Sequence, residues 1–368
     1  MLRSRHLDRG EQASRTALDR LLGRAERTIA LIERARPLNA VSEHERLCSI
    51  WQRGDRRAPE LVYARAPQLG EFRAALELIV ERLSGSPGWC KLYVDRAAEL
   101  LLEAHAAEAV GCPDFAQRAR ERYPVAGGRD GRRAAEWARN WTGASSTPAA
   151  GQAHPSDDER DPLSLFSAMR RAVGEFRLPF RVRLTPDLPC AAATGERLIL
   201  VRAGTFHTES AVRRIVLHEI EGHAVPRARA AHEPLGLFLV GSAGGADDEE
   251  GRALLLEENA GCLDGSRRSE LARRHFAALS VRDGANWVDT AELLLDLGAD
   301  LKGAFELATR VHRGGGLARE VVYLPAFARV RAALGEEPEL SDWLARGRLS
   351  IAAARELRKL GDPPELAA

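Results

Sequence analysis

The chain has 368 residues, of which 45% are hydrophobic and 29% are charged, a balance typical of a globular protein with a substantial core. Lysine and arginine together number 54 and the acidic residues 53, so the formal net charge is +1. This balance gives no overall attraction to nucleic acid or to a membrane surface, and we expect neither as a partner. No stretch approaches the roughly 20 apolar residues of a membrane span, and the first residues lack the apolar core of a signal peptide. We therefore expect a cytoplasmic protein, whose oligomeric state the sequence does not predict.

The five cysteines include no C-x-x-C pair. Their odd number and wide spacing predict neither a disulfide framework nor a cysteine-based zinc site.

Residues 1–140 are predicted to form an N-terminal helical region. In "ALDRLLGRAERTIALIERAR", leucine and isoleucine recur every three or four residues, as on one face of an amphipathic helix. Residues 141–162 are rich in Ser, Thr, Gly, Pro and charge and have no periodicity, which predicts a linker. We place a domain boundary there, so that residues 163–368 form the second domain.

The second domain is predicted to begin with a helix near 163–175 and a small sheet. "FRVRLTP" alternates apolar and basic residues as a half-buried strand does, and "ERLILVRAG" is expected to be its partner strand. In the next helix Thr208 suits the N-cap, Glu209 suits the first turn, and Pro226 is expected to end the helix. Because the rest of the chain is predicted to be helical, the fold class is α+β and predominantly helical.

This helix carries an H-E-x-x-x-H motif, made of His218, Glu219 and His223. The two histidines are one residue further apart than in the H-E-x-x-H helix of zinc metallopeptidases. Five residues of a regular α-helix rotate by about 500°, which leaves the imidazoles about 140° apart and unable to share an ion. A single π-bulge would return them to one face, and Gly222 would lower the steric cost of that distortion. The motif therefore predicts a metal site only if this helix carries a bulge.

A third ligand is expected from "GGADDEEGRALLLEENAG". Zinc in hydrolytic sites usually has three protein ligands and one open position for water. Here Asp247 or Asp248 is expected to cap a helix whose first turn carries Glu249 and Glu250. A carboxylate there would complete a His, His, Glu set, and Glu257, two turns along, would orient a ligand imidazole.

The alternative to a metal site is a structural pair of histidines. H-E-x-x-x-H is expected by chance about once in forty such sequences, so the motif alone is weak. A buried helix that carries Glu219 and two histidines favours the metal site, because unpaired carboxylates are rarely buried.

Several segments resemble a known family. "LHEIEGH" followed by "EEGRALLLEE" is similar to the microtubule-associated tyrosine carboxypeptidase family, metallopeptidases with an H-E-x-x-x-H helix and a downstream Q-E-G-L-A motif. Bacterial members of this family are often labelled flavohemoglobin expression-modulating QEGLA motif proteins. "RPLNAVSEHERL", "CAAATGERLILV" and "RVHRGGGLAREVVYL" also resemble family segments, so the resemblance covers most of the chain.

The resemblance implies a zincin-like (gluzincin-type) metallopeptidase domain that binds one Zn²⁺ per chain. It implies that His218, His223 and Glu250 are the zinc ligands and that Glu219 is the general base. The implied activity is that of a carboxypeptidase, which removes a C-terminal residue, such as tyrosine, from a peptide or protein substrate.

The chain departs from the family pattern at several positions. Glu249 and Arg252 replace the glutamine and leucine of Q-E-G-L-A, and Arg319 and Glu320 stand at the lysine and aspartate of an F-T-K-D segment. These changes leave the implied ligands and base in place. The H-E-x-x-G-H form also resembles dipeptidyl peptidase III, a larger enzyme, so a zinc endopeptidase or aminopeptidase is one alternative. A non-catalytic metal-binding regulator on a peptidase scaffold is another.

The tetrahedral oxyanion of peptide hydrolysis needs a hydrogen-bond donor. Tyr323 is the only tyrosine in the C-terminal half, and we expect it to be this donor, with a core tyrosine as the alternative. His207, His232 and His312 are weaker candidates.

Substrate contacts are expected from two further segments. One of Arg310, Arg313 and Arg319, near a glycine-rich bend, is expected to bind the substrate carboxylate, with solvated surface arginines as the alternative. Ala192 lies in "LPCAAATGE", which is expected to be a strand edge that pairs with extended substrate.

Overall fold

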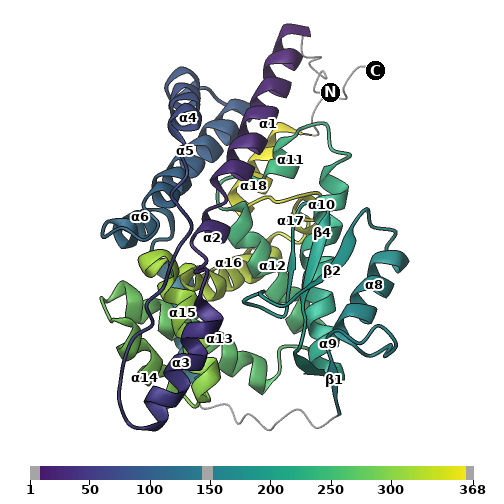
Figure 1. The fold of residues 1–368 in the computed structure, drawn as a ribbon. Coiled ribbons are helices and arrows are strands. Elements are labelled where there is room, and N and C mark those ends of the chain that lie inside the picture. The colour runs from purple at the N-terminus through teal and green to yellow at the C-terminus, as the bar shows by residue number, and fades with distance from the viewer. Residues whose placement is uncertain (1–8, 143–151, 362–368) are drawn as a thin grey trace.

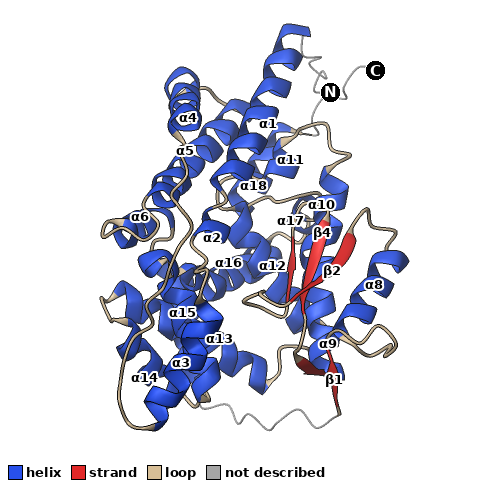
Figure 2. Ribbon diagram, in the orientation of Figure 1, coloured by secondary structure: helices blue, strands red, loops and turns tan. Residues whose placement is uncertain are grey.

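The computed structural model describes residues 9–142 and 152–361. Helices make up most of these residues, and the strands lie together on one side, as Figure 2 shows. This confirms the predicted α+β, predominantly helical class. Within the described ranges, no helix is both long enough and apolar enough to cross a bilayer.

The N-terminal part is helical, as predicted. Its helices are α1 (Arg9–Ile29), α2 (Leu31–Arg34), α3 (Ala40–Gln52), α4 (Gly70–Leu83), α5 (Trp89–Glu108), α6 (Phe115–Arg122) and α7 (Gly128–Thr142). In Figure 1, α1 and the pair α4 and α5 stand on the side of the molecule away from the strands.

Two small sheets precede the motif helix. β2 (Arg181–Thr185), β4 (Leu198–Arg202) and β3 (Ala192–Thr194) form a mixed three-stranded sheet, and β1 (Ala153–Pro155) and β5 (Phe206–Thr208) form a two-stranded one. The helix α8 (Leu165–Glu175) lies between β1 and β2 in the chain. β4 pairs in parallel with β2, which confirms the predicted strand partners, and antiparallel with β3, which lies at the edge of the sheet.

The predicted linker, residues 141–162, contains regular structure. α7 continues to Thr142, residues 143–151 lie outside the described residues, and β1 pairs antiparallel with β5. The side chain of Ser156 also donates a hydrogen bond to the carbonyl of Arg202. Residues 153–155 of the predicted linker therefore form a strand, because a partner strand far along the chain holds them. The domain boundary itself stays a prediction.

The remaining described chain is helical. Its elements are α9 (Glu209–Leu217), the π-helix η1 (His218–Ala224), α10 (Val225–Ala230), α11 (Leu237–Val240), α12 (Gly245–Asn259), α13 (Gly265–Arg282), α14 (Trp287–Asp296), α15 (Leu301–Gly316), the 3₁₀ helix η2 (Arg319–Val322), α16 (Tyr323–Glu336), α17 (Leu340–Leu344) and α18 (Ile351–Leu360).

The buried side chains form three clusters, and these place the motif helix. The largest cluster joins N-terminal helices, through residues such as Leu22 and Leu100, to C-terminal helices, through residues such as Phe305 and Leu357. A second cluster fills the space between the sheet, α8 and the motif helix. A third packs α7 against α12, α13 and α16. The motif helix therefore has the sheet on one side and α12 on another.

Candidate functional site

The motif helix contains the distortion that its spacing requires. Thr208 caps α9 by accepting a hydrogen bond from the backbone NH of Ala211. At His218 the helix changes to the π-helix η1, which continues to Ala224. The wider turn brings the rings of His218 and His223 to a centroid distance of 5.0 Å. The predicted bulge is confirmed.

Gly222 serves this helix in a different way from the one predicted. Its φ is not in the left-handed region, so its conformation does not require a glycine. A Cβ at this position would lie only 2.8 Å from the Cβ of Ala253 in α12. Gly222 therefore allows the motif helix and α12 to approach each other.

The prediction that Pro226 ends the helix is wrong. α10 begins at Val225 and continues to Ala230, with Pro226 in its first turn. Proline has no backbone NH, so a carbonyl of the preceding turn loses its helical donor. Arg252 of α12 supplies replacement donors, because its guanidinium donates to the carbonyls of Glu221, at 3.3 Å, and Gly222. The helix therefore continues through the proline with support from a neighbouring helix.

α12 begins earlier than predicted, with Gly244 as its N-cap. Asp247 and Asp248 lie in the first turn, but neither caps the helix. Asp247 accepts from Arg122 of α6 at 3.4 Å, and Asp248 accepts from Arg329 of α16 at 2.8 Å. These acidic side chains attach the start of α12 to other helices.

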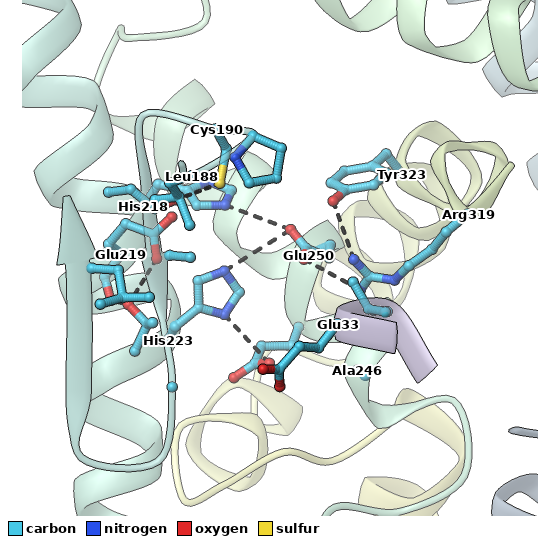
Figure 3. A pocket seen from close by; sticks show the side chains of 18 of the residues that line it. Glu33, Leu188, Cys190, His218, Glu219, His223, Ala246, Glu250, Arg319 and Tyr323 are labelled. Atoms are coloured by element: carbon cyan, nitrogen blue, oxygen red, sulfur yellow. Dashed lines mark hydrogen bonds and ion pairs between the residues drawn. The ribbon is translucent and has the colours of Figure 1, made fainter. Parts of the chain in front are cut away.

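α12 brings Glu250 to the two histidines. Oε2 of Glu250 lies 3.5 Å from Nε2 of His218 and 3.9 Å from Nε2 of His223. One ligand atom from each of the three residues lies within 4.8 Å of the others. Figure 3 shows Glu250 between the two imidazoles and the side chains of Arg319 and Tyr323. The three residues implied as zinc ligands are thus brought together.

The Nδ1 atom of each imidazole faces a second carboxylate. Nδ1 of His218 is hydrogen-bonded to Glu257 at 2.7 Å, and Arg267 holds that carboxylate with bonds of 2.8 and 2.9 Å. Nδ1 of His223 lies 3.3 Å from Oε2 of Glu249, without the alignment of a hydrogen bond. Glu257 occupies the position that the sequence predicts for it, whereas the contact of Glu249 was not predicted.

The electrostatics of the cluster favour positive charge on the imidazole of His218. Burial alone would lower the pKa of His218, but hydrogen bonds to Glu250 and Glu257 raise it to about 9. Burial opposes ionisation of Glu257 too, yet Arg267 and His218 lower its pKa to about 2. The pKa of Glu250 is held well below its ordinary value by His218 and Arg319 against the effect of burial. These buried acids stay ionised and create a strong preference for a cation between them.

Glu219 is held in place by a residue that the sequence does not single out. The side chain of Glu219 is buried, and its Oε2 accepts a hydrogen bond from Oγ1 of Thr194 at 2.7 Å. Thr194 lies in the edge strand β3, and the same hydroxyl lies 3.2 Å from the backbone carbonyl of Glu219. The sequence feature that could have identified Thr194 is its place in "LPCAAATGE", the segment expected to be a strand edge that pairs with substrate.

Tyr323 lies across the site from the motif helix, at the start of α16. Its hydroxyl oxygen accepts hydrogen bonds from Arg319 at 3.3 Å and from Arg310 at 3.4 Å. Arg319 also lies 3.3 Å from Oε1 of Glu250. Arg319 therefore connects the hydroxyl of Tyr323 to the carboxylate that faces the histidines.

Arg310 and Arg313 share a buried acid. Nε of Arg310 lies 2.6 Å and Nη2 of Arg313 lies 3.3 Å from Oε1 of Glu320. Burial opposes the charge on Glu320, but the two arginines lower its pKa to about 2. Glu320, which departs from the family pattern, thus acts as the counter-ion of two arginines that the sequence predicts as substrate ligands.

These residues line a cavity of about 830 Å³. Ala192 and Thr194 of β3 form part of its wall, and Arg310, Arg313, Arg319 and Tyr323 lie in it as well. Among the weaker oxyanion candidates, His207 lines the cavity, His232 is exposed, and His312 is hydrogen-bonded to Thr290 away from it.

The N-terminal helices form another part of the cavity wall. Glu26 of α1 accepts hydrogen bonds from Arg96 of α5 and from Arg348. Nε of Arg348 lies 3.7 Å from Glu249, the carboxylate behind His223. A chain of half-buried and buried charges therefore leads from the first helices to the histidines.

The comparison with protein families supports the resemblance. A family model described as microtubule-associated tyrosine carboxypeptidase matches residues 51–363. The chain belongs to this family. The part that matches the microtubule-associated tyrosine carboxypeptidase model includes the motif helix, α12 and Tyr323, and also the N-terminal helices α4 to α7. No curated protein and no solved structure matches the chain significantly.

Proposed function

We propose that the protein is a zinc-dependent metallocarboxypeptidase with a zincin-like (gluzincin-type) catalytic domain. Its substrate is a peptide or protein from which it hydrolyses the C-terminal residue. The observation that carries the proposal is the convergence of His218, His223 and Glu250 within 4.8 Å in a cavity that also holds Glu219. Membership in a family described as a carboxypeptidase supports the same activity.

The three candidate ligands fit a zinc ion. Zinc takes such ligands at about 2.0–2.2 Å, which in a tetrahedron separates the ligand atoms by about 3.4 Å. The two imidazole nitrogens lie 3.5 and 3.9 Å from Oε2 of Glu250, so small side-chain movements suffice. Two imidazoles and one carboxylate are also the donor set of many catalytic zinc sites. The ionised carboxylates around the imidazoles favour a cation in this position.

Bound zinc would supply Lewis-acid chemistry, by polarising the substrate carbonyl and making water acidic near neutral pH. In this proposal Glu219 accepts the proton of the attacking water and passes it to the leaving amine. Thr194 holds Oε2 of Glu219, so the other carboxylate oxygen remains for this proton transfer.

In this proposal Tyr323 donates a hydrogen bond to the oxyanion. Its oxygen already accepts from Arg310 and Arg319, which directs its own proton toward another acceptor. A preorganised donor of this kind stabilises charge that develops in the transition state. The positive charges of Arg310 and Arg319 further stabilise the negative charge of the oxyanion.

The edge strand β3 supports binding of an extended substrate. β3 has a partner strand on one side only, and Ala192 lines the cavity. Extended peptides commonly bind by adding a strand to such an edge. The small side chain of Ala192 permits this close approach.

The test compares a peptide with a free C-terminus and the same peptide with an amidated C-terminus. We expect zinc in protein purified without added metal, measured by mass spectrometry, and release of the last residue from the free peptide only. Glu219→Gln should lose activity by at least about a hundredfold while it retains zinc. Equal cleavage of both peptides would indicate an endopeptidase or aminopeptidase. Unchanged activity of Glu219→Gln would contradict the assignment of the base.

A further inference from the structure

One arginine of the cavity forms no ion pair within the part of the chain that the structure describes. Arg214 lines the cavity, yet it makes no hydrogen bond and no ion pair with any residue that the structure describes. Every other arginine that lines the cavity donates a hydrogen bond to a carboxylate or a backbone carbonyl within the described ranges. A half-buried cation without a counter-ion costs free energy, so its retention in a cavity indicates a ligand that supplies the charge.

The surroundings of Arg214 are cationic overall. Arg267 and Arg274 also line the cavity and lie close enough to act on the charge of Arg214, and both bind Glu270. Arg267 also binds Glu257. Arg267 and Arg274 thus form ion pairs with both carboxylates, which leaves the charge of Arg214 without an ion pair among the described residues. Burial and the neighbouring Arg267 lower the pKa of Arg214, although arginine stays protonated at neutral pH. The unbalanced charge suits an anionic ligand.

Arg214 is also close to the reacting centre along the helix. It stands four residues before His218 in α9, so both side chains point to the same face, one turn of about 5.4 Å apart. In a carboxypeptidase substrate, the terminal carboxylate lies one residue beyond the carbonyl that is attacked, about 3.8 Å further along the chain. The long side chain of Arg214 can cover this separation.

We propose that Arg214 binds the C-terminal carboxylate of the substrate and thereby restricts hydrolysis to the last peptide bond. This inference rests on the proposed function. It differs from the sequence-based prediction that Arg310, Arg313 or Arg319 binds the carboxylate. Those three guanidinium groups bind Glu320, Glu250 or Tyr323, whereas Arg214 has its donors available. A guanidinium can hold a carboxylate with two parallel hydrogen bonds. An amidated C-terminus has only one acceptor oxygen and cannot accept both.

The test uses the zinc-loaded enzyme with an acetylated Ala-Ala-Tyr peptide and its C-terminal amide. Hydrogen bonds to charged groups predict that Arg214→Gln lowers kcat/KM for the free acid by about 10- to 100-fold. The loss should appear mainly in KM, and the amide should remain uncleaved, as it is expected to be in the wild type. Arg214→Lys keeps the charge without the two-pronged geometry and should be intermediate. Arg213→Gln, at an exposed arginine one position earlier, is the matched control and should behave as wild type.

A binding measurement separates this inference from the proposed function. In the Glu219→Gln background, isothermal titration should show tighter binding of the acid than of the amide, and adding Arg214→Gln should abolish the difference. If the wild type hydrolyses neither peptide, the proposed function fails, and this titration still tests Arg214. If Arg214→Gln discriminates between acid and amide as well as the wild type does, in hydrolysis and in binding, the assignment of Arg214 is overturned.

Discussion

Replacing Gly222 with alanine should disturb the metal site without changing any candidate ligand. The added Cβ would lie 2.8 Å from the Cβ of Ala253, whereas ordinary contacts are 3.4–4 Å. The motif helix and α12 would therefore have to separate by about 0.6–1.2 Å. Because His223 is on one helix and Glu250 on the other, this movement changes the distance between two of the three ligands.

The expected effects follow from that displacement. Overpacking of this kind destabilises a protein by about 1–3 kcal/mol. Metal sites tolerate errors of about 0.2 Å in ligand distance, so we expect the zinc affinity of Gly222→Ala to fall by at least about tenfold. Affinity would be measured by competition with a chromophoric chelator, and stability by urea unfolding of the metal-free protein.

A second substitution provides the control. Ala253→Gly removes the methyl group that the new Cβ meets, and the next atom, Cα of Ala253, is 3.5 Å away. The double variant should recover most of the zinc affinity, although glycine inside α12 costs about 1 kcal/mol of stability. Wild-type zinc affinity in Gly222→Ala, or no recovery in the double variant, would refute the close-approach argument.

Two further predictions concern the residues that hold the base and the first histidine. Thr194→Val removes the donor to the Glu219 carboxylate and should lower kcat about tenfold with little change in KM. Thr194→Ser keeps the donor and should restore kcat. An unchanged kcat in the valine variant would show that this hydrogen bond is dispensable. Glu257→Gln should weaken zinc binding by about 10- to 100-fold in the chelator assay, because the imidazole of His218 loses its carboxylate partner. Glu258→Gln, one position along the same helix, is the control for this variant, and equal affinities of the two would contradict the role of Glu257.

The features that the sequence predicts well are local. The π-helix follows from the spacing of His218 and His223, because helix geometry alone fixes where positions five apart point. The cap at Thr208 and the strand pair β2 and β4 likewise follow from residue types within a few positions.

The features that the sequence does not predict depend on distant partners. Pro226 is read as a helix end because nothing nearby shows that Arg252 will supply the missing donors. The role of Gly222 depends on Ala253, which belongs to another helix. The strand at 153–155 forms because 206–208 lies beside it, and three residues alone carry no strand pattern.

The site residues divide in the same way. Glu250 and Glu257 stand out through their spacing and through the family resemblance. Thr194 becomes visible only when β3 is placed against η1. The sequence does not distinguish Arg214 from the many other arginines of the chain. Its role can be inferred only once the hydrogen-bond partners of the other arginines in the cavity are known.

The ion pairs at the N-terminal wall of the cavity determine whether a shortened fragment of the protein can keep the site intact. A fragment that starts at residue 163 would lack Glu26 and Arg122, so Arg348 and Asp247 would each lose an ionic partner on the way to α12. Arg348 would then have Glu249 as its remaining acidic contact, and His223 would compete for the same carboxylate. Removal of the N-terminal helices is therefore expected to damage catalysis although every candidate catalytic residue stays in the fragment, so the two halves of the chain depend on each other for activity.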